Sequence, residues 1–441
     1  MCHGELGETD IPPVPGPNVP SSEFASDGNA PSMRLFGPME GHLFSLGVID
    51  RKYSEVLTFL TNPNLSLPRP QPVMIGARLV LCIRGSSFDE NMPDDISTRY
   101  TTKMRVGIIG TGAISNMHAR ALKNIGYELT VCTDVFPEAG KKFADTYGCE
   151  FVPTYEELCR HPKVDYVDVC TFPDFRLQPI EICAQSKKHV QVQKPIAVSM
   201  ETAHKMVDVA KKAGIILGVV SQHRFDDSSR FLKTAIAAGR LGKIIQADAY
   251  VKWFRSAAYY SRPIKGSWAT EGGGAMINQA IHQVDVLLWL VGKVKEVVGF
   301  WQLGALHKIE SEDVVNAMLR FEDGATGVIT ASTAMWPGYS ERVEIHGTKG
   351  TAIITGDKLT SWDVENDSGP AAPVEQSVLS GASDPMAIPL TPFERQFLDF
   401  GNACKTGGTP LVSGEEGLRA LELVMATYLS CREHRIVELG N

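Results

Sequence analysis

The sequence of 441 residues lacks paired cysteine motifs, a basic run and a long apolar stretch, and each absence argues against a class of protein. None of its nine cysteines forms a C-x-x-C pair, and the number is odd, so we expect reduced thiols rather than a disulfide framework or a zinc site. No basic run offsets the net charge of -8, which argues against nucleic acid or an anionic membrane surface as a partner. No apolar stretch reaches the roughly 18–20 residues that span a bilayer. The first residues also lack the basic start and apolar run of a signal peptide, so we expect a cytoplasmic protein.

The remaining composition is that of a folded globular protein, with 43% hydrophobic and 21% charged residues. The length is sufficient for two domains. Residues 1–103 begin with a stretch rich in Pro, Gly and Ser without apolar periodicity, and Met104 leads directly into an apolar strand. We expect residues 1–103 to be a disordered or non-native extension, residues 104–226 to form a cofactor-binding domain, and residues 227–441 to form a second domain that binds substrate.

Residues 104–226 alternate short β-branched strands with helices. The strands expected from their apolar runs lie at 105–109, 129–133, 164–171, 189–193 and 215–220. Between the first two, apolar residues of 113–125 recur on one helical face, and Pro137 suits the first turn of the next helix. This alternation predicts a doubly wound parallel sheet.

After residue 226 the pattern changes to long alternating strands separated by turns, which predicts an α/β domain with a large, mostly antiparallel open sheet. We expect helices near 228–239, 274–291, 392–405 and 414–432. The long face of this sheet predicts a homo-oligomer, either a homodimer or a homotetramer.

A glycine motif directly follows the first strand. Gly110 allows the tight turn, and Gly112 lets the backbone approach a pyrophosphate, while Ala113 and Ile114 open a helix whose free N–H groups favour phosphate. Asp134 ends the second strand a little over 20 residues later, where a carboxylate can bind both ribose hydroxyls. Because this carboxylate would repel a 2′-phosphate and no Arg follows closely, we expect NAD rather than NADP.

Two later segments carry candidate chemistry. Lys194 follows the fifth strand and so lies at the ligand-binding edge of the sheet, although a lone Lys is often only a solvated charge. On the apolar helix near 274–291, Asn278, His282 and Asp285 are spaced to share one face. They form either a site, in which Asn278 and Asp285 bind substrate, or a hydrogen-bonded core cluster; a metal site would need more ligands than this, so no metal is expected.

Aromatic and charged residues gather just before the glycines of that helix, and such pairs suit the C–H faces and hydroxyl edges of a carbohydrate. The candidates for substrate binding in this segment are Lys252, Arg255, Tyr260 and Trp268. Ordinary sheet packing is the alternative for some aromatics, and we expect Trp253 or Tyr250 in the core.

From Met104 onward the chain resembles the glucose–fructose oxidoreductase / inositol dehydrogenase / rhizopine-catabolism family (Gfo/Idh/MocA). The resemblance rests on GTGAISNMHA at 110–119, TFPD at 171–174, QKP at 193–195, VSQHRF at 220–225, GGGAMINQAIHQVD at 272–285 and LVSGEEGLRALELV at 411–424. It implies a Rossmann domain joined to an α/β domain, with Lys194 and His282 as the catalytic pair. His282 would take the substrate hydroxyl proton while hydride passes to the nicotinamide, and Asp285 would orient His282. By the same resemblance, Thr171, Pro173, Gln193 and Lys194 belong to the cofactor site.

Two departures bear on the substrate. Many family members carry Glu where this chain has Gln193, and inositol-dehydrogenase-like members carry Asp where it has Asn278. Asn cannot relay a proton, so inositol itself is in doubt, and we expect a sugar, glycoside or polyol substrate. Two alternatives share the scaffold: a redox-neutral, NAD-dependent glycoside-cleaving enzyme, and a non-catalytic NAD-sensing regulator. Both Lys194 and His282 are present, which disfavours the regulator.

Overall fold

The computed structural model describes residues 103–262, 264–370 and 389–440, all within the compact unit Met92–Asn441. The expectations for residues 1–103 therefore lie, except for Lys103, outside the described residues. Within the described ranges, no helix has both the length and the apolar content needed to cross a membrane.

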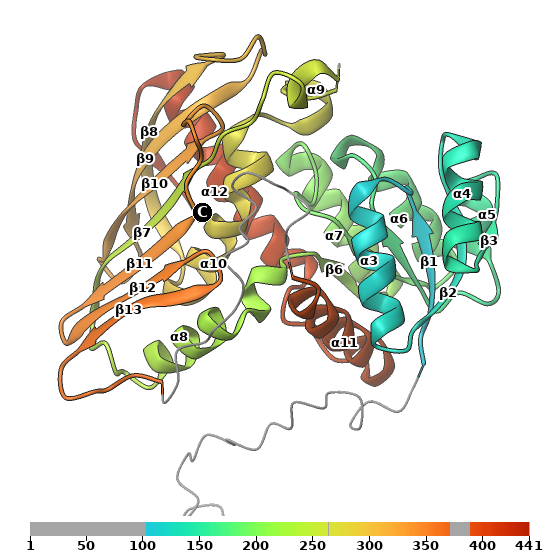
Figure 1. The fold of residues 1–441 in the computed structure, drawn as a ribbon, viewed down its shortest axis with the longest axis horizontal. Helices are drawn as coiled ribbons and strands as arrows, with labels where there is room; N and C mark the ends of the chain where they lie inside the picture. Colours follow the sequence, from blue (N-terminus) through green and yellow to red (C-terminus); the bar gives the residue numbers. More distant parts are fainter. Residues whose placement is uncertain (1–102, 263, 371–388, 441) are drawn as a thin grey trace, which may run out of the picture. The chain divides into compact units, whose positions relative to one another are not determined.

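The first sheet has six parallel strands in the order β3-β2-β1-β4-β5-β6 (Figure 1). Its strands are β1 (Arg105–Ile109), β2 (Glu128–Thr133), β3 (Glu150–Phe151), β4 (Tyr166–Val169), β5 (His189–Val192) and β6 (Leu217–Val219). Most of their residues are buried, as expected for strands covered on both faces, although neither residue of the edge strand β3 is. The chain order reverses between β1 and β4, and ligands of such sheets bind at the carboxyl ends of the strands beside this reversal.

Helices connect these strands, as the sequence pattern predicts. They are α3 (Ala113–Asn124), α4 (Pro137–Tyr147), α5 (Tyr155–Arg160), the short η3 (Pro173–Phe175), α6 (Leu177–Gln185) and α7 (Met200–Ala213). Pro137 opens α4 as expected, and Gly148 ends it in the left-handed conformation, with φ of 73°. The Ser199 side chain caps α7 by accepting from the Thr202 N–H.

The second sheet has eight strands in the order β13-β12-β11-β7-β10-β9-β8-β14. Its strands are β7 (Ile244–Lys252), β8 (Val294–Leu303), β9 (Glu312–Phe321), β10 (Thr326–Ser332), β11 (Arg342–Gly347), β12 (Gly350–Thr355), β13 (Lys358–Val364) and β14 (Val437–Glu438). Only the β7–β10 pair is parallel, so the prediction of a mostly antiparallel sheet is confirmed.

Helices cover one face of this sheet. The helices that pack on it are α8 (Asp227–Ala237), the π-helical η6 (Met276–Ala280), α10 (Ile281–Val291) and α12 (Gly414–Glu433). Three short helices lie in the same part of the chain: η4 (Gln222–Phe225), η5 (Tyr259–Ser261) and α9 (Trp268–Glu271). α12 packs on β8 and α10 packs on β7. On the opposite face, Phe300 and Met318 are 68% and 64% exposed.

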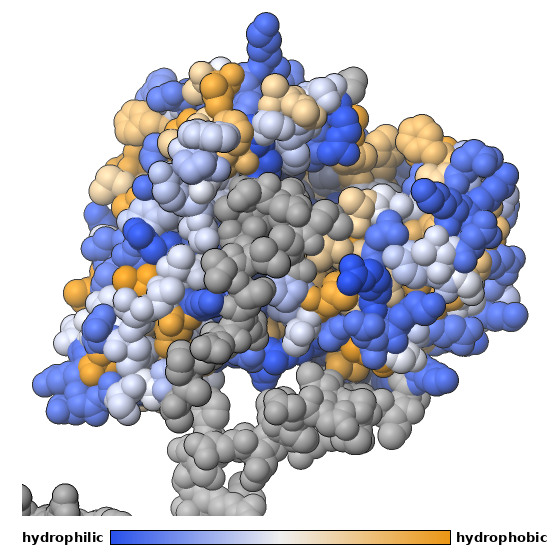
Figure 2. All heavy atoms as spheres, viewed as in Figure 1, coloured by the Kyte–Doolittle hydropathy of each residue, from blue (hydrophilic) through white to orange (hydrophobic). Residues whose placement is uncertain are grey.

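The remaining helix, α11 (Thr391–Thr406), comes after β13 in sequence but packs against α3 and η4. Its Phe393, Phe397 and Phe400 are buried in one hydrophobic cluster with residues of β1, α3 and β2. The carboxy-terminal part of the chain thus completes the core beneath the first sheet. Over the face drawn in Figure 2, hydrophobic residues occur in small groups among hydrophilic ones.

Candidate active site

The glycine turn after β1 is shaped to admit a phosphate group. Gly110 has φ of +88°, and a Cβ there would lie 3.2 Å from backbone atoms of Cys170. Around Gly112 no atom lies within 4 Å of the corresponding Cβ position. The amino terminus of α3 has no side-chain cap and no acidic residue in its first turn. Open space above uncapped N–H groups fits a pyrophosphate, which supports the predicted role of this turn, including Ala113 and Ile114.

Asp134 lies beside this turn, at the end of β2. Its Oδ2 accepts from the Thr111 backbone N–H at 2.7 Å and from the Thr111 hydroxyl at 2.8 Å. Its Oδ1 accepts from the Phe136 N–H at 2.9 Å. These contacts hold the carboxylate half-buried at the strand end, where a fixed negative charge favours ribose hydroxyls over a 2′-phosphate.

A buried arginine holds together the loops that carry the other predicted cofactor residues. Arg176 donates to the carbonyl oxygen of Thr171 at 2.6 Å and to the carbonyls of Gln193 and Pro195. Burial lowers its pKa to about 9. Pro173 is buried at the start of η3, between Thr171 and Arg176. The sequence reasoning missed Arg176, whose only signal is a single charge between the TFPD segment and an apolar helix.

Gln193 has two partners that explain its position before Lys194. Its Oε1 accepts from the Lys194 N–H at 3.1 Å, and its Nε2 lies 2.7 Å from Nε2 of His118. The His118 Nδ1 lies 2.7 Å from Oδ2 of Asp168, and both side chains are fully buried. A Gln amide can donate to one imidazole nitrogen while the other nitrogen donates to the carboxylate. This buried chain fixes the backbone at the end of β5.

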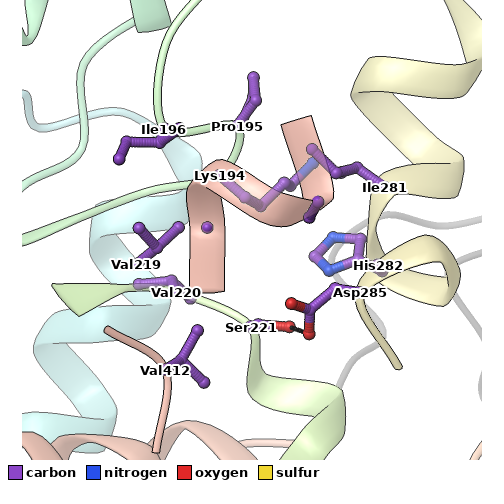
Figure 3. Close-up of a pocket in the computed structure, with 12 residues that line it drawn as sticks. Lys194, Pro195, Ile196, Val219, Val220, Ser221, Ile281, His282, Asp285 and Val412 are labelled. Atoms are coloured by element: carbon purple, nitrogen blue, oxygen red, sulfur yellow. Dashed lines mark hydrogen bonds between the residues drawn. The ribbon is translucent and has the colours of Figure 1, made fainter. Parts of the chain in front are cut away.

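Lys194 reaches from β5 to the helix of the second domain (Figure 3). Its Nζ donates to the backbone carbonyl of Asn278 at 2.6 Å. Burial lowers the pKa of Lys194 to about 7, and the neighbouring cations Lys265 and Arg176 act in the same direction. An ammonium group with a pKa near neutrality can stabilise an alkoxide and can also exchange a proton.

The carbonyl that binds Lys194 lies in a π-helical turn, not in the continuous helix expected over 274–291. Three glycines precede the turn, and a Cβ on Gly274 would lie 1.8 Å from the carbonyl oxygen of Glu312. The buried Glu312 carboxylate accepts from the N–H groups of Gly274 at 2.7 Å and Met276 at 2.9 Å. The glycines and this carboxylate therefore set the start of the turn, and π turns of this kind are frequent at functional sites. The spacing of apolar residues in the sequence predicts neither the π-helical turn nor the contact with Glu312 that sets its start.

His282 lies one turn beyond Asn278 and lines a small cavity together with Lys194, Pro195, Ile196, Ser221 and Asp285. Its Nδ1 is buried, and it has no hydrogen-bond partner among the described residues. Burial lowers the pKa of His282 well below its usual value, and the cations Lys194 and His223 contribute to the same shift. The imidazole is therefore neutral at pH 7 and able to accept a proton.

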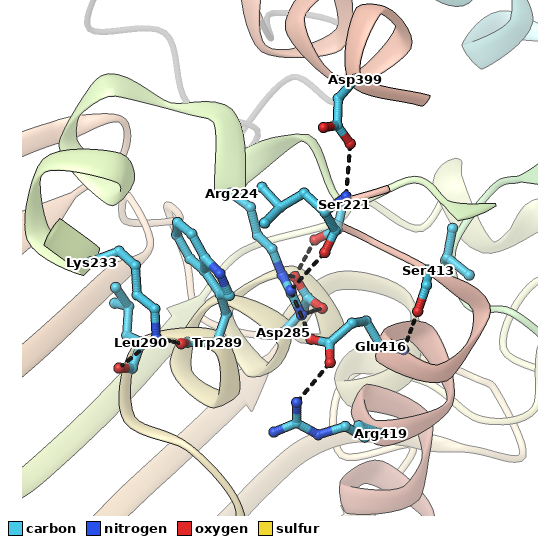
Figure 4. Close-up of polar contacts among 12 residues, drawn as sticks. Ser221, Arg224, Lys233, Asp285, Trp289, Leu290, Asp399, Ser413, Glu416 and Arg419 are labelled. Carbon is cyan, nitrogen blue, oxygen red and sulfur yellow. Dashed lines mark hydrogen bonds and ion pairs between the residues drawn. The ribbon is translucent and has the colours of Figure 1, made fainter. Parts of the chain in front are cut away.

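Asp285 has a different partner from the one expected. Its carboxylate binds Arg224 at two points, each of 2.7 Å, and accepts from the Ser221 hydroxyl (Figure 4). Arg224 also pairs with Glu416 of α12 at 2.8 Å. No hydrogen bond joins Asp285 to His282 within the part of the chain that the structure describes, so the expectation that Asp285 orients His282 is corrected. Asp285 instead ties η4, α10 and α12 together.

The other predicted substrate residues divide into two groups. Asn278 turns its amide back to the carbonyls of Gly273 and Gly274, each at 3.2 Å. Arg255 is buried over the ring of Trp253 and is close enough to Lys194 to lower its pKa. Asn278 thus meets Lys194 through its own backbone carbonyl and Arg255 acts on Lys194 through its charge, but neither side chain lines the cavity. Of the two expected core aromatics, Trp253 is buried and Tyr250 is half-buried.

Among the described residues, the second group makes no contact with Lys194 or His282 and does not line the cavity either. Tyr260 bonds Thr333 at 2.8 Å, and the indole N–H of Trp268 donates to the Glu310 carbonyl at 3.1 Å. Lys252 is exposed on β7 next to the buried Val251, so its side chain points to the sheet face opposite α10. The alternation of side chains along β7 therefore decides on which face Lys252 lies, and the residue composition of the segment does not.

Sequence reasoning also missed His223. It falls in the VSQHRF segment that carries the resemblance, where the residue pattern alone assigns the histidine no chemistry. The ring centroids of His223 and His282 lie 5.2 Å apart, with an interplanar angle of 86°. The Nδ1 of His223 lies 2.8 Å from Oδ2 of Asp226.

Two further clusters of side chains have atoms of the kind that bind metal ions. One consists of His118, Asp168 and Cys170, and the other of Asp248, Glu344 and His346. Protein hydrogen bonds already engage both, so neither supports a metal centre.

Comparison with known proteins agrees with this geometry. Residues 104–221 match the model of the oxidoreductase family with an NAD-binding Rossmann fold, and residues 229–353 match the GFO/IDH/MocA C-terminal domain. The chain is 29% identical to a myo-inositol 2-dehydrogenase of Thermotoga maritima over 76% of its length and 98% of that protein. It is 26% identical to an inositol 2-dehydrogenase of Rhizobium meliloti, over 76% of this chain and 99% of that one.

Among solved structures, the chain is similar to the WlbA dehydrogenase of Bordetella pertussis, which was crystallised with NADH and UDP-GlcNAcA. The TM-score is 0.68 at 29% identity, over 77% of this chain and all of that one. The fold, the glycine turn and both matched domains lead to one conclusion: this chain is an NAD-binding oxidoreductase of the Gfo/Idh/MocA family.

Proposed function

We propose that the protein is an NAD(H)-dependent dehydrogenase or reductase that acts on a hydroxyl group of a sugar, glycoside or polyol. The observation that carries the proposal is the meeting of Lys194 and His282 in one cavity at the carboxyl edge of the first sheet, on the same edge as the glycine turn that fits a pyrophosphate. The inositol dehydrogenases among its relatives, and the nucleotide sugar acid bound to the similar structure, support a carbohydrate or polyol substrate.

In this proposal His282 is the general base. It is neutral at pH 7, and its Nδ1 has no partner among the described residues, so it can take the proton of the substrate hydroxyl. The Lys194 ammonium stabilises the negative charge that develops on that oxygen. Bound NAD+ supplies the two-electron acceptor for the carbon that is oxidised. Gly110, Gly112 and Asp134 hold the cofactor, and Asn278 and Arg255 contact the substrate.

We also propose a homo-oligomer that buries the open face of the second sheet. Phe300 and Met318 are large apolar side chains exposed on that face, away from the helices. Light scattering at micromolar concentration tests this, and a monomer contradicts it. We further propose a domain boundary near residue 226.

We also propose that the protein works in a reducing compartment such as the cytoplasm. The unpaired state of the seven described cysteines supports such a compartment.

Absorbance at the NADH band tests the function. The purified full chain is mixed with NAD or NADP and with a panel of glucose, inositols, N-acetylhexosamines, uronic acids and simple glycosides. We expect NADH to form with one class of substrate and NADP to be used less well. A flat trace across the panel, with NAD binding shown by calorimetry, would contradict the proposal. Cleavage of a glycoside without NADH accumulation would then identify the redox-neutral alternative.

A further inference from the structure

The π turn that carries Asn278 is held at its start by side chains of other elements. The turn has no side-chain cap of its own, and the first N–H groups of a helix find no partner within it. The Glu312 carboxylate of β9 binds the N–H groups of Gly274 and Met276. The Tyr428 hydroxyl of α12 accepts from the next N–H group, that of Ile277, at 3.3 Å. The place of the turn therefore depends on one strand and one helix that are distant in sequence.

The hydroxyl of Tyr428 joins these two supports. It donates to Oε1 of Glu312 at 2.7 Å while it accepts from the Ile277 N–H. Tyr428 and Glu312 are 3% and 0% exposed, so bulk water does not replace a bond that either of them loses. Burial raises the pKa of Glu312, whereas the hydrogen bonds from Met276, Tyr428 and Gly274 lower it. The hydroxyl therefore helps to keep Glu312 a charged acceptor for the turn.

The ring of Tyr428 is held independently of its hydroxyl. It packs edge to face on Trp268, with ring centroids 5.2 Å apart and an interplanar angle of 86°, and on Trp301 at 5.7 Å. A Cβ at Gly273 would lie 2.5 Å from the hydroxyl oxygen, so the glycine leaves room for it. Removal of the hydroxyl alone would therefore leave the packing of the ring in place.

The same helix, α12, holds α10 at a second point, shortly after His282. Glu416 of α12 pairs with Arg224 at 2.8 Å, and Arg224 binds the Asp285 carboxylate (Figure 4). α12 packs on both η6 and α10. His282 lies between the contact at Ile277 and the contact at Asp285, so α12 fixes the segment that carries His282 on both sides.

We propose, on the basis of the function proposed above, that Tyr428 is a positioning residue for catalysis. Its hydroxyl holds the π turn where the Asn278 carbonyl meets the Lys194 ammonium, at 2.6 Å, and where His282 lines the cavity. Neither Tyr428 nor Glu312 lines that cavity, so Tyr428 acts through Asn278 and His282, without contact with substrate. A shift of the turn moves both catalytic groups relative to the reacting hydroxyl, and catalysis is sensitive to displacements of about 1 Å.

The test compares Tyr428→Phe with Tyr166→Phe. Tyr166 is a matched control because it is fully buried in β4, its ring packs edge to face on Phe400, and its hydroxyl has no partner among the described residues. We expect Tyr428→Phe to lower kcat by roughly tenfold or more, with little change in KM or in NAD affinity. Tyr166→Phe should keep the wild-type rate. A Tyr428→Phe variant with the kcat of wild type would overturn the proposal.

The pH profile separates positioning from a general loss of stability. The Asn278 carbonyl favours the charged form of Lys194, so a looser turn should lower the pKa of Lys194 further than burial does, to below about 7. The alkaline decline of kcat/KM should therefore move to lower pH in Tyr428→Phe. Both variants keep the charged groups that act on Lys194, which are Lys265, Arg176, Glu271 and Arg255. A reduced kcat with an unmoved profile would indicate structural damage only and would refute the positioning role.

A further measurement does not depend on turnover. Amide hydrogen exchange of residues 272–284 is followed by mass spectrometry in the full chain. Without the hydroxyl, the Ile277 N–H loses its acceptor, so this segment should exchange severalfold faster in Tyr428→Phe than in wild type or Tyr166→Phe. Equal exchange in all three proteins would show that Tyr428 does not hold the turn.

Glu312→Gln takes the place of Tyr428→Phe if the latter does not fold, because it weakens the acceptor of the Gly274 and Met276 N–H groups and should give the same changes. A wild-type protein without activity on any substrate contradicts the proposed function, and hydrogen exchange then decides whether Tyr428 holds the turn. An active wild type with an indifferent Tyr428 contradicts only the positioning role.

Discussion

Gly274→Ala tests how the lysine and the π turn are held together. An alanine Cβ at this position would lie 1.8 Å from the Glu312 carbonyl oxygen, whereas real Cβ contacts essentially never fall under 3.0 Å. The nearest atom is the backbone carbonyl oxygen of Glu312 in β9, which cannot rotate away as a flexible side chain could. The glycine segment must therefore move by about 1.2 Å or more. That movement breaks the bond of 2.7 Å from the Gly274 N–H to the Glu312 carboxylate.

The cost has two parts. Overpacking of a tight interior contributes about 1–3 kcal/mol, and a lost hydrogen bond that leaves buried polar groups unsatisfied contributes about 1–3 kcal/mol. We expect the free energy of unfolding to fall by about 3–5 kcal/mol, which lowers the melting temperature by roughly 5–15 °C. The displaced Asn278 carbonyl also loses its contact of 2.6 Å with Lys194, so kcat should fall as well.

Scanning fluorimetry and the NADH assay measure both effects. Gly408→Ala is the matched control, because its Cβ would meet only the Thr406 hydroxyl, at 3.2 Å. It should melt within a few degrees of wild type and keep the wild-type rate. If Gly274→Ala melts like Gly408→Ala and turns over normally, then the close approach of the glycines to β9 is not present in the protein, and the account of the π turn fails.

The remaining predictions concern single groups of the site. His282→Ala should lower kcat by roughly 10²–10⁴ and leave NAD affinity nearly intact, as measured by calorimetry; a change in KM alone would show that the histidine only binds. Asp134→Ala should weaken NAD binding and raise the relative use of NADP, and an unaltered cofactor preference would count against the ribose contact. The kcat/KM profile should decline as pH rises through about 7, because the Lys194 ammonium loses its proton there, and should decline at acid pH only well below 6.5, where His282 gains one. Lys194→Met should abolish the decline near pH 7, and a profile identical to wild type would exclude Lys194 as its source.

Much of the fold was predictable because it depends on local patterns. The strand at 105–109 and the turns at Gly110 and Gly112 follow from apolar runs and glycine placement, and the structure has them at those positions. Two short strands, β3 and β14, were not predicted, since two residues carry no period. The edge strand β13 was also missed, because its residues are half-buried or exposed and show no clear alternation.

The candidate site was predictable in its chemistry but not in its contacts. Lys194 and His282 could be named from position and resemblance, and the structure brings them to one cavity. The partner of Asp285 could not, because Arg224 lies 61 residues away in the chain and only the tertiary fold decides which charge it meets. The same holds for the close packing of Gly274 on Glu312, which depends on the approach of two backbones from different elements.

The return of α11 to the first sheet has a consequence for how this chain can be divided. Phe393, Phe397 and Phe400 fill the space beneath β1 and α3, so a fragment that ends near residue 226 would leave that hydrophobic surface open to water. Such a fragment should aggregate or require its missing helix in trans. The two domains are consecutive in most of the sequence but interlocked at its end. Recombination that exchanges one domain for that of a distant relative must therefore also exchange a helix encoded about 165 residues downstream of the apparent junction.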